Sequence, residues 1–353
     1  MTVAAPTAPP AQTDLRFPFP APPAAGTVID VAPGVRWLRM PLPFALDHIN
    51  LWLVQDTGGW AIVDCGFNSD DTRAAWEPLL AAHAPITRVI VTHYHPDHIG
   101  LAGWLTRRTG TTMWTTEAEY LTAHAVRDGF AGYGAQALVD LFRAHGLDST
   151  NLEAIGGRGN AYRRGVDELP VSFRRITEGD AIDIGGNAWH VIIGHGHAPE
   201  HASLHCPALG VVIAGDMLLP KISTNTSVWA TEPDGDPVGQ FLRSIRRYLE
   251  LPADTLVLPS HGLPFRGIAS RVAALASHHE ARLGELVAAC DQPRAAADVL
   301  DVLFRRKLDQ QQLYFAMGEA IAHLNHLALR GALTRTRDAN SVFRFKSTSQ
   351  PPT

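Results

Sequence analysis

Cysteine is scarce in this chain of 353 residues, which has only Cys65, Cys206 and Cys290, widely spaced along the sequence. Three such cysteines provide no disulfide framework, so a small disulfide-stapled fold is excluded and a reducing, cytoplasmic location is favoured. We predict that Cys65 and Cys206 are buried packing residues rather than catalytic nucleophiles.

The sequence also lacks a long apolar run and a strong excess of either charge. No stretch reaches the roughly 18 apolar residues that a membrane span needs, so no membrane partner is expected. The formal net charge is −5, so the molecule as a whole does not attract nucleic acid. Hydrophobic residues make up 46% of the chain, which at this length is enough for a sizeable core.

The chain divides into three parts by composition and pattern. Residues 1–26 are rich in Pro and Ala and lack a basic segment before an unbroken apolar stretch, so we predict a flexible or surface-draped arm rather than a signal peptide. Residues 27–290 alternate short β-type runs with helical segments, which indicates one large domain. Within it, residues from about 116 to 165 read as a helical insertion that could overhang a site. Residues 291–353 favour helices followed by a two-stranded wing, a winged-helix-like extension.

The strongest chemical signal is a His-x-His-x-Asp-His cluster that follows the apolar run 89–91. Residues two apart in an extended strand point to the same side, so the imidazoles of His93 and His95 can reach one ion. Asp97 and His98 open the next helix and face a second point nearby. Imidazole and carboxylate together suit zinc, and also iron or manganese. The cluster therefore predicts about half of the ligands of a two-metal site.

Three further candidates come after later apolar strands, each beside a glycine: His197, Asp216 and His261. Glycine allows the backbone and an ion to approach closely. Any one histidine among 17 is usually an ordinary surface or core residue, but the same strand-end pattern recurs at all three positions. We therefore expect these residues to complete the ligand set.

Together, these motifs resemble those of the metallo-β-lactamase fold superfamily. The segment 92–100 looks like its signature, 63–66 resembles its early Asp-x-Gly motif, and the later candidates match its further motifs in order. The likeness covers roughly residues 27–270, which makes 27–290 the expected catalytic domain. It implies an α+β fold, a four-layer αββα sandwich with the site at one edge of the two sheets.

The resemblance also implies a role for each candidate ligand. It places His93, His95 and His197 on one metal, Asp97, His98 and His261 on a second, and Asp216 between the two. Asp64 would orient a ligand, as metal-bound histidines usually require; a purely structural Asp at a strand end is the alternative.

Two divalent ions, zinc first with iron or manganese as alternatives, lower the pKa of a shared water to about 7. A bridging hydroxide is then the expected nucleophile. Asp97 is placed to bind the second metal and to orient or accept a proton from the hydroxide. His201, four residues beyond His197, is a candidate for contacting substrate or steadying an oxyanion, with an ordinary surface-loop position as the alternative.

Two classes of substrate are open. The first hypothesis is a hydrolase of a small carboxylic thioester, ester or lactone that binds under the insertion. Aromatic residues in and beside the insertion could line a pocket or simply pack in a core: Trp114, Tyr120, Phe130, Tyr133 and Phe142.

The second hypothesis is a nuclease or phosphodiesterase acting on RNA or a small phosphodiester. It rests on a modest basic patch in the tail, which is made of Arg330, Arg335, Arg337, Arg344 and Lys346. The overall acidity disfavours tight RNA binding, and the tail could equally be a packing or homodimer element.

Overall fold

The computed structural model describes residues 14–44 and 46–348. The first half of the predicted arm, residues 1–13, lies outside these residues. Within the described part, Arg16 exchanges two backbone hydrogen bonds with Arg266, at 3.1 and 2.9 Å. The ring of Phe17 lies 6.5 Å from that of Phe265. From residue 14 onward the chain therefore follows the surface of the large domain.

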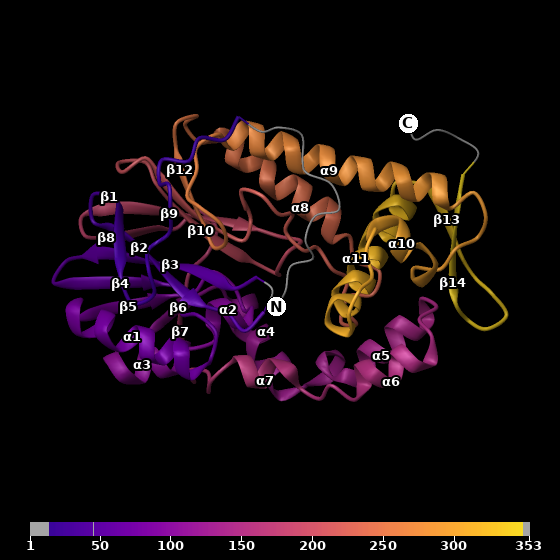
Figure 1. Cartoon of the computed structure of the whole chain (residues 1–353), viewed down its shortest axis with the longest axis horizontal. Helices are drawn as coiled ribbons and strands as arrows, with labels where there is room; N and C mark the ends of the chain where they lie inside the picture. The colour runs from indigo at the N-terminus through magenta and orange to yellow at the C-terminus, as the bar shows by residue number, and fades with distance from the viewer. Residues whose placement is uncertain (1–13, 45, 349–353) are drawn as a thin grey trace.

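Two twisted β-sheets form the centre of the large domain, on the left in Figure 1. The first sheet contains, in spatial order, β1 (Val28–Ala32), β2 (Val35–Pro41), β3 (His48–Asp56), β4 (Gly59–Val63), β5 (Ile86–Ile90), β6 (Met113–Thr115) and β7 (Phe173–Arg175). Strands β1 to β4 pair antiparallel, and β4 to β7 pair parallel.

The second sheet contains, in spatial order, β12 (Leu256–Pro259), β11 (Val211–Gly215), β10 (His201–Cys206), β9 (Asn187–Gly194) and β8 (Ala181–Ile184). Only the β11–β12 pair is parallel; the other three pairs are antiparallel. The inner faces of the two sheets share one apolar core that contains the fully buried Trp37, Trp52 and Trp189. Large rings of this kind bury much apolar surface, so they hold the two sheets together.

Helices cover both outer faces of the sheets. On the first sheet, α1 (Asp70–Ala82) and α3 (Ala102–Thr109) pack over a second core. On the second, α8 (Pro237–Arg246) and α9 (Ile268–Ala289) pack over a third. The four-layer αββα sandwich expected from the sequence is confirmed.

The predicted insertion is helical and packs against the tail rather than standing apart. It contains α4 (Glu117–Asp128), η1 (Ala131–Tyr133), α5 (Ala135–Ala144), α6 (Ser149–Gly156) and α7 (Ala161–Gly165). The tail contains η3 (Ala297–Val299), α10 (Leu300–Leu303), α11 (Gln310–Leu329) and the hairpin of β13 (Leu333–Arg337) and β14 (Phe343–Ser347). Side chains of α5, α6, α9 and α11 share one apolar cluster. In Figure 1, α11 accordingly descends from α9 toward α5 and α6.

The helix that Asp97 and His98 were expected to open is short. It forms α2 (Pro96–Ile99), and α3 follows as a separate helix, because the backbone N–H of Leu101 donates to the carbonyl of Gly66 rather than within a helix. In the tail, α10 ends before Phe304, which is extended and buried. Among the described residues, no helix has both the length and the apolar character needed to cross a bilayer.

Candidate metal centre

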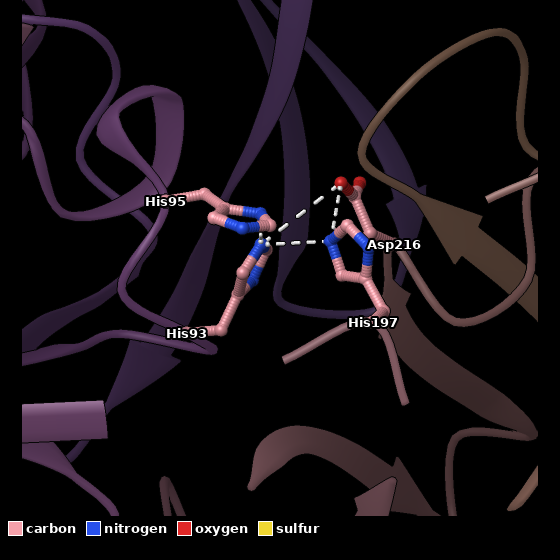
Figure 2. A group of neighbouring side chains, drawn as sticks. All are labelled: His93, His95, His197 and Asp216. Carbon is pink, nitrogen blue, oxygen red and sulfur yellow. Dashed lines mark hydrogen bonds and ion pairs between the residues drawn. The ribbon is translucent and has the colours of Figure 1, made fainter. Parts of the chain in front are cut away.

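The candidate ligands come together at one edge of the sandwich. The segment 91–98 that follows β5, called the metal loop below, carries His93, His95, Asp97 and His98, the last two on the short helix α2. The loops after β9, β11 and β12 carry one candidate each. Neighbouring strands that run in one direction end at the same edge of a sheet, so residues far apart in sequence meet there. Figure 2 shows His93 and His95 facing the two residues that come from the second sheet, His197 and Asp216.

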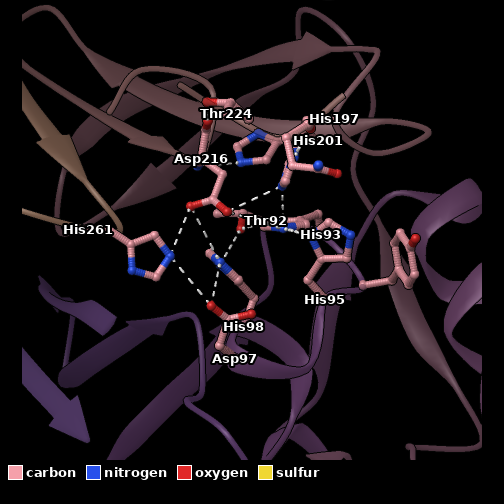
Figure 3. Close-up of polar contacts among 12 residues, drawn as sticks. Thr92, His93, His95, Asp97, His98, His197, His201, Asp216, Thr224 and His261 are labelled. Carbon is pink, nitrogen blue, oxygen red and sulfur yellow. Dashed lines mark hydrogen bonds and ion pairs between the residues drawn. The ribbon is translucent and has the colours of Figure 1, made fainter. Parts of the chain in front are cut away.

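The ligand atoms form two buried groups. One contains His93, His95, His197 and Asp216, and the other contains Asp97, His98 and His261; within each group the atoms lie within 4.8 Å of one another. This division matches the one implied by the family resemblance. Figure 3 shows both groups together, on either side of Asp216.

The two carboxylate oxygens of Asp216 face different groups. Oδ2 lies 3.2 Å from Nε2 of His197 and 4.0 Å from Nε2 of His93. Oδ1 lies 3.6 Å from Nε2 of His98 and 3.5 Å from Nε2 of His261. A carboxylate held in this way can contribute one oxygen to each of two cations.

Three of the histidines are held by hydrogen bonds on the ring nitrogen that faces away from the centre. Nδ1 of His98 lies 2.8 Å from Oδ2 of Asp64, Nδ1 of His197 lies 2.8 Å from the carbonyl of Asn225, and Nδ1 of His261 lies 2.9 Å from the carbonyl of His48. An acceptor on Nδ1 fixes the proton there and leaves Nε2 free as a ligand.

Asp64 is held in place by the start of the metal loop. Its Oδ1 accepts hydrogen bonds from the backbone N–H and the hydroxyl of Thr92, at 2.8 and 3.0 Å. Its backbone has φ of +63°, a left-handed conformation that costs energy for an aspartate. These contacts give Asp64 the geometry of a residue that orients His98.

The electrostatics favour bound cations. Burial works to raise the pKa of Asp216, but the nearby imidazoles, His261 and His98 first, hold it well below its ordinary value. The pKa of His93 is lowered well below its ordinary value, first by burial and then by the neighbouring histidines. In the other group, burial works to lower the pKa values of His98 and His261, but the neighbouring carboxylates raise them. The carboxylates therefore draw positive charge to the centre, which a metal ion supplies when it displaces the protons.

Two buried atoms at the centre have no hydrogen-bond partner among the described residues: Nε2 of His98 and Oδ1 of Asp216. Buried polar atoms are normally paired, and unpaired ones are costly. Divalent cations would pair both atoms, and a donor set of five imidazoles and two carboxylates suits zinc, iron or manganese. The residues therefore fit the cofactor that the sequence predicts.

His201 does not face an open site. Its side chain is fully buried, and its Nε2 accepts the backbone N–H of Asp216 at 3.1 Å. Gly215 makes this contact possible, since a Cβ there would lie 2.3 Å from the same nitrogen. This burial gives the predicted catalytic role of His201 no support; the contact instead positions Asp216.

Glu119, on α4, was not anticipated from the sequence. Its Oε2 accepts the backbone N–H of Tyr94 at 2.8 Å, and its Oε1 accepts that of Glu200 at 2.6 Å. Tyr94 lies between His93 and His95, and Glu200 precedes His201, so one carboxyl joins two loops of the centre. Burial raises the pKa of Glu119 to about 8, against the effect of these backbone hydrogen bonds.

A cavity of about 500 Å³ adjoins the metal loop, lined there by Tyr94 and Pro96. Its far walls come from the insertion and the tail, including Tyr133, Tyr314 and Phe315. The hydroxyl of Tyr162, on α7, donates to the carbonyl of Tyr94 at 2.5 Å and fixes the insertion against the loop. The insertion and the tail thus bound a space that reaches the metal loop at Tyr94 and Pro96, while none of the candidate ligands is among its lining residues.

Of the five aromatic residues considered as pocket lining, only Tyr133 lines this cavity. Phe142 is fully buried in the cluster shared with the tail, and Phe130 is 71% exposed. Tyr120 stacks on Phe173, and Trp114 lies beneath two arginine side chains. Of the two alternatives left open for these residues, the pocket applies to Tyr133 and the core to Phe142.

The fold and the paired ligand groups define a metal-dependent hydrolase of the αββα sandwich class. The chain belongs to the metallo-β-lactamase superfamily, whose family model matches residues 45–261. A second model, the metallo-β-lactamase-like C-terminal domain, matches residues 283–348.

Relatives and solved structures agree with this membership. A β-lactamase domain protein from Burkholderia ambifaria is 46% identical, with a TM-score of 0.88 over 95% of this chain and 98% of that one. A metallo-β-lactamase family protein from Thermus thermophilus is 31% identical, with a TM-score of 0.77 over 90% of this chain and 100% of that one. A probable metallo-hydrolase of Bacillus subtilis (strain 168) is 27% identical over 88% of this chain and 97% of its own.

Proposed function

We propose that this protein is a dinuclear metal-dependent hydrolase of small carboxylic thioesters, esters or lactones. The observation that carries the proposal is the position of Asp216, whose two oxygens face two separate ligand groups. His93, His95 and His197 would hold one ion and Asp97, His98 and His261 the other, with Asp216 shared. When bound, two such ions supply an activated water and polarise the bond under attack.

The residues of the chain set the protonation of the site. Burial works to raise the pKa of Asp97, but His98 and His261 hold it below its ordinary value. Its Oδ2 lies 3.4 Å from Nε2 of His261. Asp97 therefore enters the reaction as an ionised carboxylate that can orient a water or receive its proton. We propose that Asp64, Glu119 and His201 act indirectly, by holding other residues of the centre in place. Their respective contacts are the ring of His98, the backbone of Tyr94 and the backbone of Asp216.

The adjoining cavity supports an acyl substrate. Its walls are largely aromatic and aliphatic, and a space of about 500 Å³ is in the range of small-molecule sites. A thioester or ester whose acyl or leaving group is apolar would place its carbonyl at the metal loop and its body in the cavity.

The nuclease alternative loses support, because three of the five basic residues of the tail have acidic partners. Arg335 pairs with Asp234 at 2.7 Å, and Arg344 pairs with Asp298 at 2.9 Å. Arg330 lies 4.0 Å from Glu280. Arginines that are paired with carboxylates, on a protein with a net negative charge, are expected to bind a phosphate backbone weakly.

A parallel activity panel tests the proposal: an acyl thioester, a lactone, an aryl ester, a bis-aryl phosphodiester and single-stranded RNA. We expect turnover of one or more of the three carboxylic substrates. Hydrolysis of the RNA or the phosphodiester alone would contradict the proposed reaction class.

Substitutions identify the site responsible for any turnover. Asp97→Ala and His95→Ala should lower kcat at least about a thousandfold with the fold intact, because each removes a ligand and a charge from the centre. His190→Ala, at an exposed histidine on β9, is the matched control and should keep native activity. Full turnover in either ligand variant would rule out this centre as the active site.

A further inference from the structure

Arg158 is the one cationic side chain of the cavity wall, among the described residues, with a buried donor that has no hydrogen-bond partner. It lies in the turn between α6 and α7 and lines the cavity. Its Nη1 is buried and has no hydrogen-bond partner in the described part of the chain. Its guanidinium carbon lies 4.9 Å from the ring centre of Tyr314 on α11. The side chain is thus held between the insertion and the tail, with a donor left unsatisfied.

The other charged residues of the cavity wall already have partners. Arg163 pairs with Asp128 at 3.2 Å and also donates to the carbonyl of Arg127. Arg164 donates to the carbonyl of Arg158 at 3.5 Å. Three arginines and one aspartate give the wall a net charge of +2. No carboxylate within residues 14–44 and 46–348 forms an ion pair with Arg158.

A guanidinium in this setting suits an anionic partner. A buried donor of a charged group is costly to leave unpaired. Arginine presents a rigid, planar fork that binds carboxylate or phosphate through two parallel hydrogen bonds. Stacking on Tyr314 fixes the plane of the fork, so little side-chain entropy is lost when an anion binds.

We propose that Arg158 is a specificity-determining residue that binds an anionic group at the end of the substrate remote from the metal centre. The substrate then has an apolar body, a hydrolysable carbonyl at one end and a carboxylate or phosphate at the other. This inference rests on the proposed function for the use of the cavity as the substrate pocket. Binding of the anion itself does not depend on turnover.

Equilibrium binding to the purified protein with its native metals tests the inference. Isothermal titration would use 4-phenylbutyrate, 3-phenylpropyl phosphate and the neutral 4-phenylbutanol. We expect one or both anions to bind at least about tenfold more tightly than the alcohol. The tighter of the two anions identifies the group that the natural substrate carries.

Variants locate the binding. Arg158→Gln should weaken binding of the anion at least about tenfold and leave the alcohol within about twofold. Arg158→Lys should have an intermediate effect, because an ammonium keeps the charge and loses the fork. Arg143→Gln, at an exposed arginine on α5 that pairs with Asp140, is the matched control and should bind as the native protein does. Thermal melts of all the variants confirm that they are folded.

Two results would overturn the inference: anions that bind no better than the alcohol, or anions that bind Arg158→Gln as tightly as the native protein. The second would be expected for an anion that sits on the metals. If the activity panel fails on all carboxylic substrates while Arg158→Gln still loses the anion, the anion site stands and the proposed reaction does not.

Discussion

At the scale of single residues, four carboxyls with little exposure to solvent fall into two pairs with opposite pKa shifts. Asp97 and Asp216 lie among imidazoles that lower their pKa values. Glu119 and Glu319 lie where burial raises the pKa, to about 8 and about 7. Glu319, on α11, accepts a hydrogen bond from the side chain of Asn225 at 3.3 Å. The tail thereby holds the residue whose carbonyl orients His197.

Glu319 predicts a pH dependence of stability. Its folded pKa, about 7, lies above the ordinary value of 4.5, so the folded state binds the proton more tightly than the unfolded state. Its contribution to stability is therefore full below about pH 4.5 and is lost as pH rises through 7. Between pH 5 and 8, the native protein should lose on the order of 2 kcal/mol of unfolding free energy relative to Glu319→Gln.

Urea unfolding of both proteins at the two pH values measures this difference. Glu153→Gln, at an exposed position on α6, is the control and should follow the native protein at both. Parallel pH profiles for the native protein and Glu319→Gln would show that this carboxyl is not perturbed by burial.

At this scale, sequence reasoning predicted the seven candidate ligands that the structure brings together, and also Asp64, but not Glu119. His197, Asp216 and His261 each follow an apolar strand beside a glycine, which is a local pattern that the sequence shows directly. Glu119 stands three residues after Thr116, a spacing that indicates an ordinary helix cap. Its actual partners, the backbone N–H groups of Tyr94 and Glu200, are set by how distant loops meet, and no short motif carries that information.

At the scale of elements, the metal loop is followed by helices that pack closely against other backbone. A Cβ on Gly103, in α3, would lie 1.6 Å from the carbonyl oxygen of Glu168. A Cβ on Gly100 would lie 2.5 Å from the carbonyl oxygen of Gly66. The strands were predictable from their apolar runs, whereas the break between α2 and α3 was not, because it results from this crossing of chain segments.

Gly103→Ala should therefore destabilise the protein by about 3 kcal/mol, because backbone must move to admit one methyl group. Gly284→Ala is the matched control: it lies in α9 with nothing within 4 Å of the added Cβ. It should stabilise by about 1 kcal/mol through helix propensity alone. Thermal or urea unfolding of the two variants measures both effects. Equal effects of the two substitutions would contradict the close packing of α3.

At the scale of the whole molecule, the insertion and the tail share one apolar core although about 150 residues separate them in sequence. The ring of Phe345, on β14, is fully buried and lies 6.1 Å from that of His145, beyond the end of α5. The sequence predicted both segments as helical but gave no sign that they meet, since each pattern shows only that one face is apolar. Their contact forms the outer walls of the cavity.

Phe345→Ala should lower the unfolding free energy by about 3–5 kcal/mol, as expected when a buried ring is removed. Phe130→Ala, at a side chain that is 71% exposed, should change it by about 0.5 kcal/mol or less. Because Phe345 supports the cavity walls, its variant should also raise KM for an apolar thioester more than it lowers kcat. A variant with native stability and native KM would show that the tail is independent of the insertion.

The number of metal ions bound per chain in the purified protein tests the two-metal centre most directly. Elemental analysis of the native chain should give close to two divalent ions per molecule. His261→Ala should give close to one, because it disrupts the group with Asp97 and His98 and leaves the group of His93, His95, His197 and Asp216 intact. A native protein that holds one ion or none after growth in metal-supplemented medium would contradict the two-metal centre.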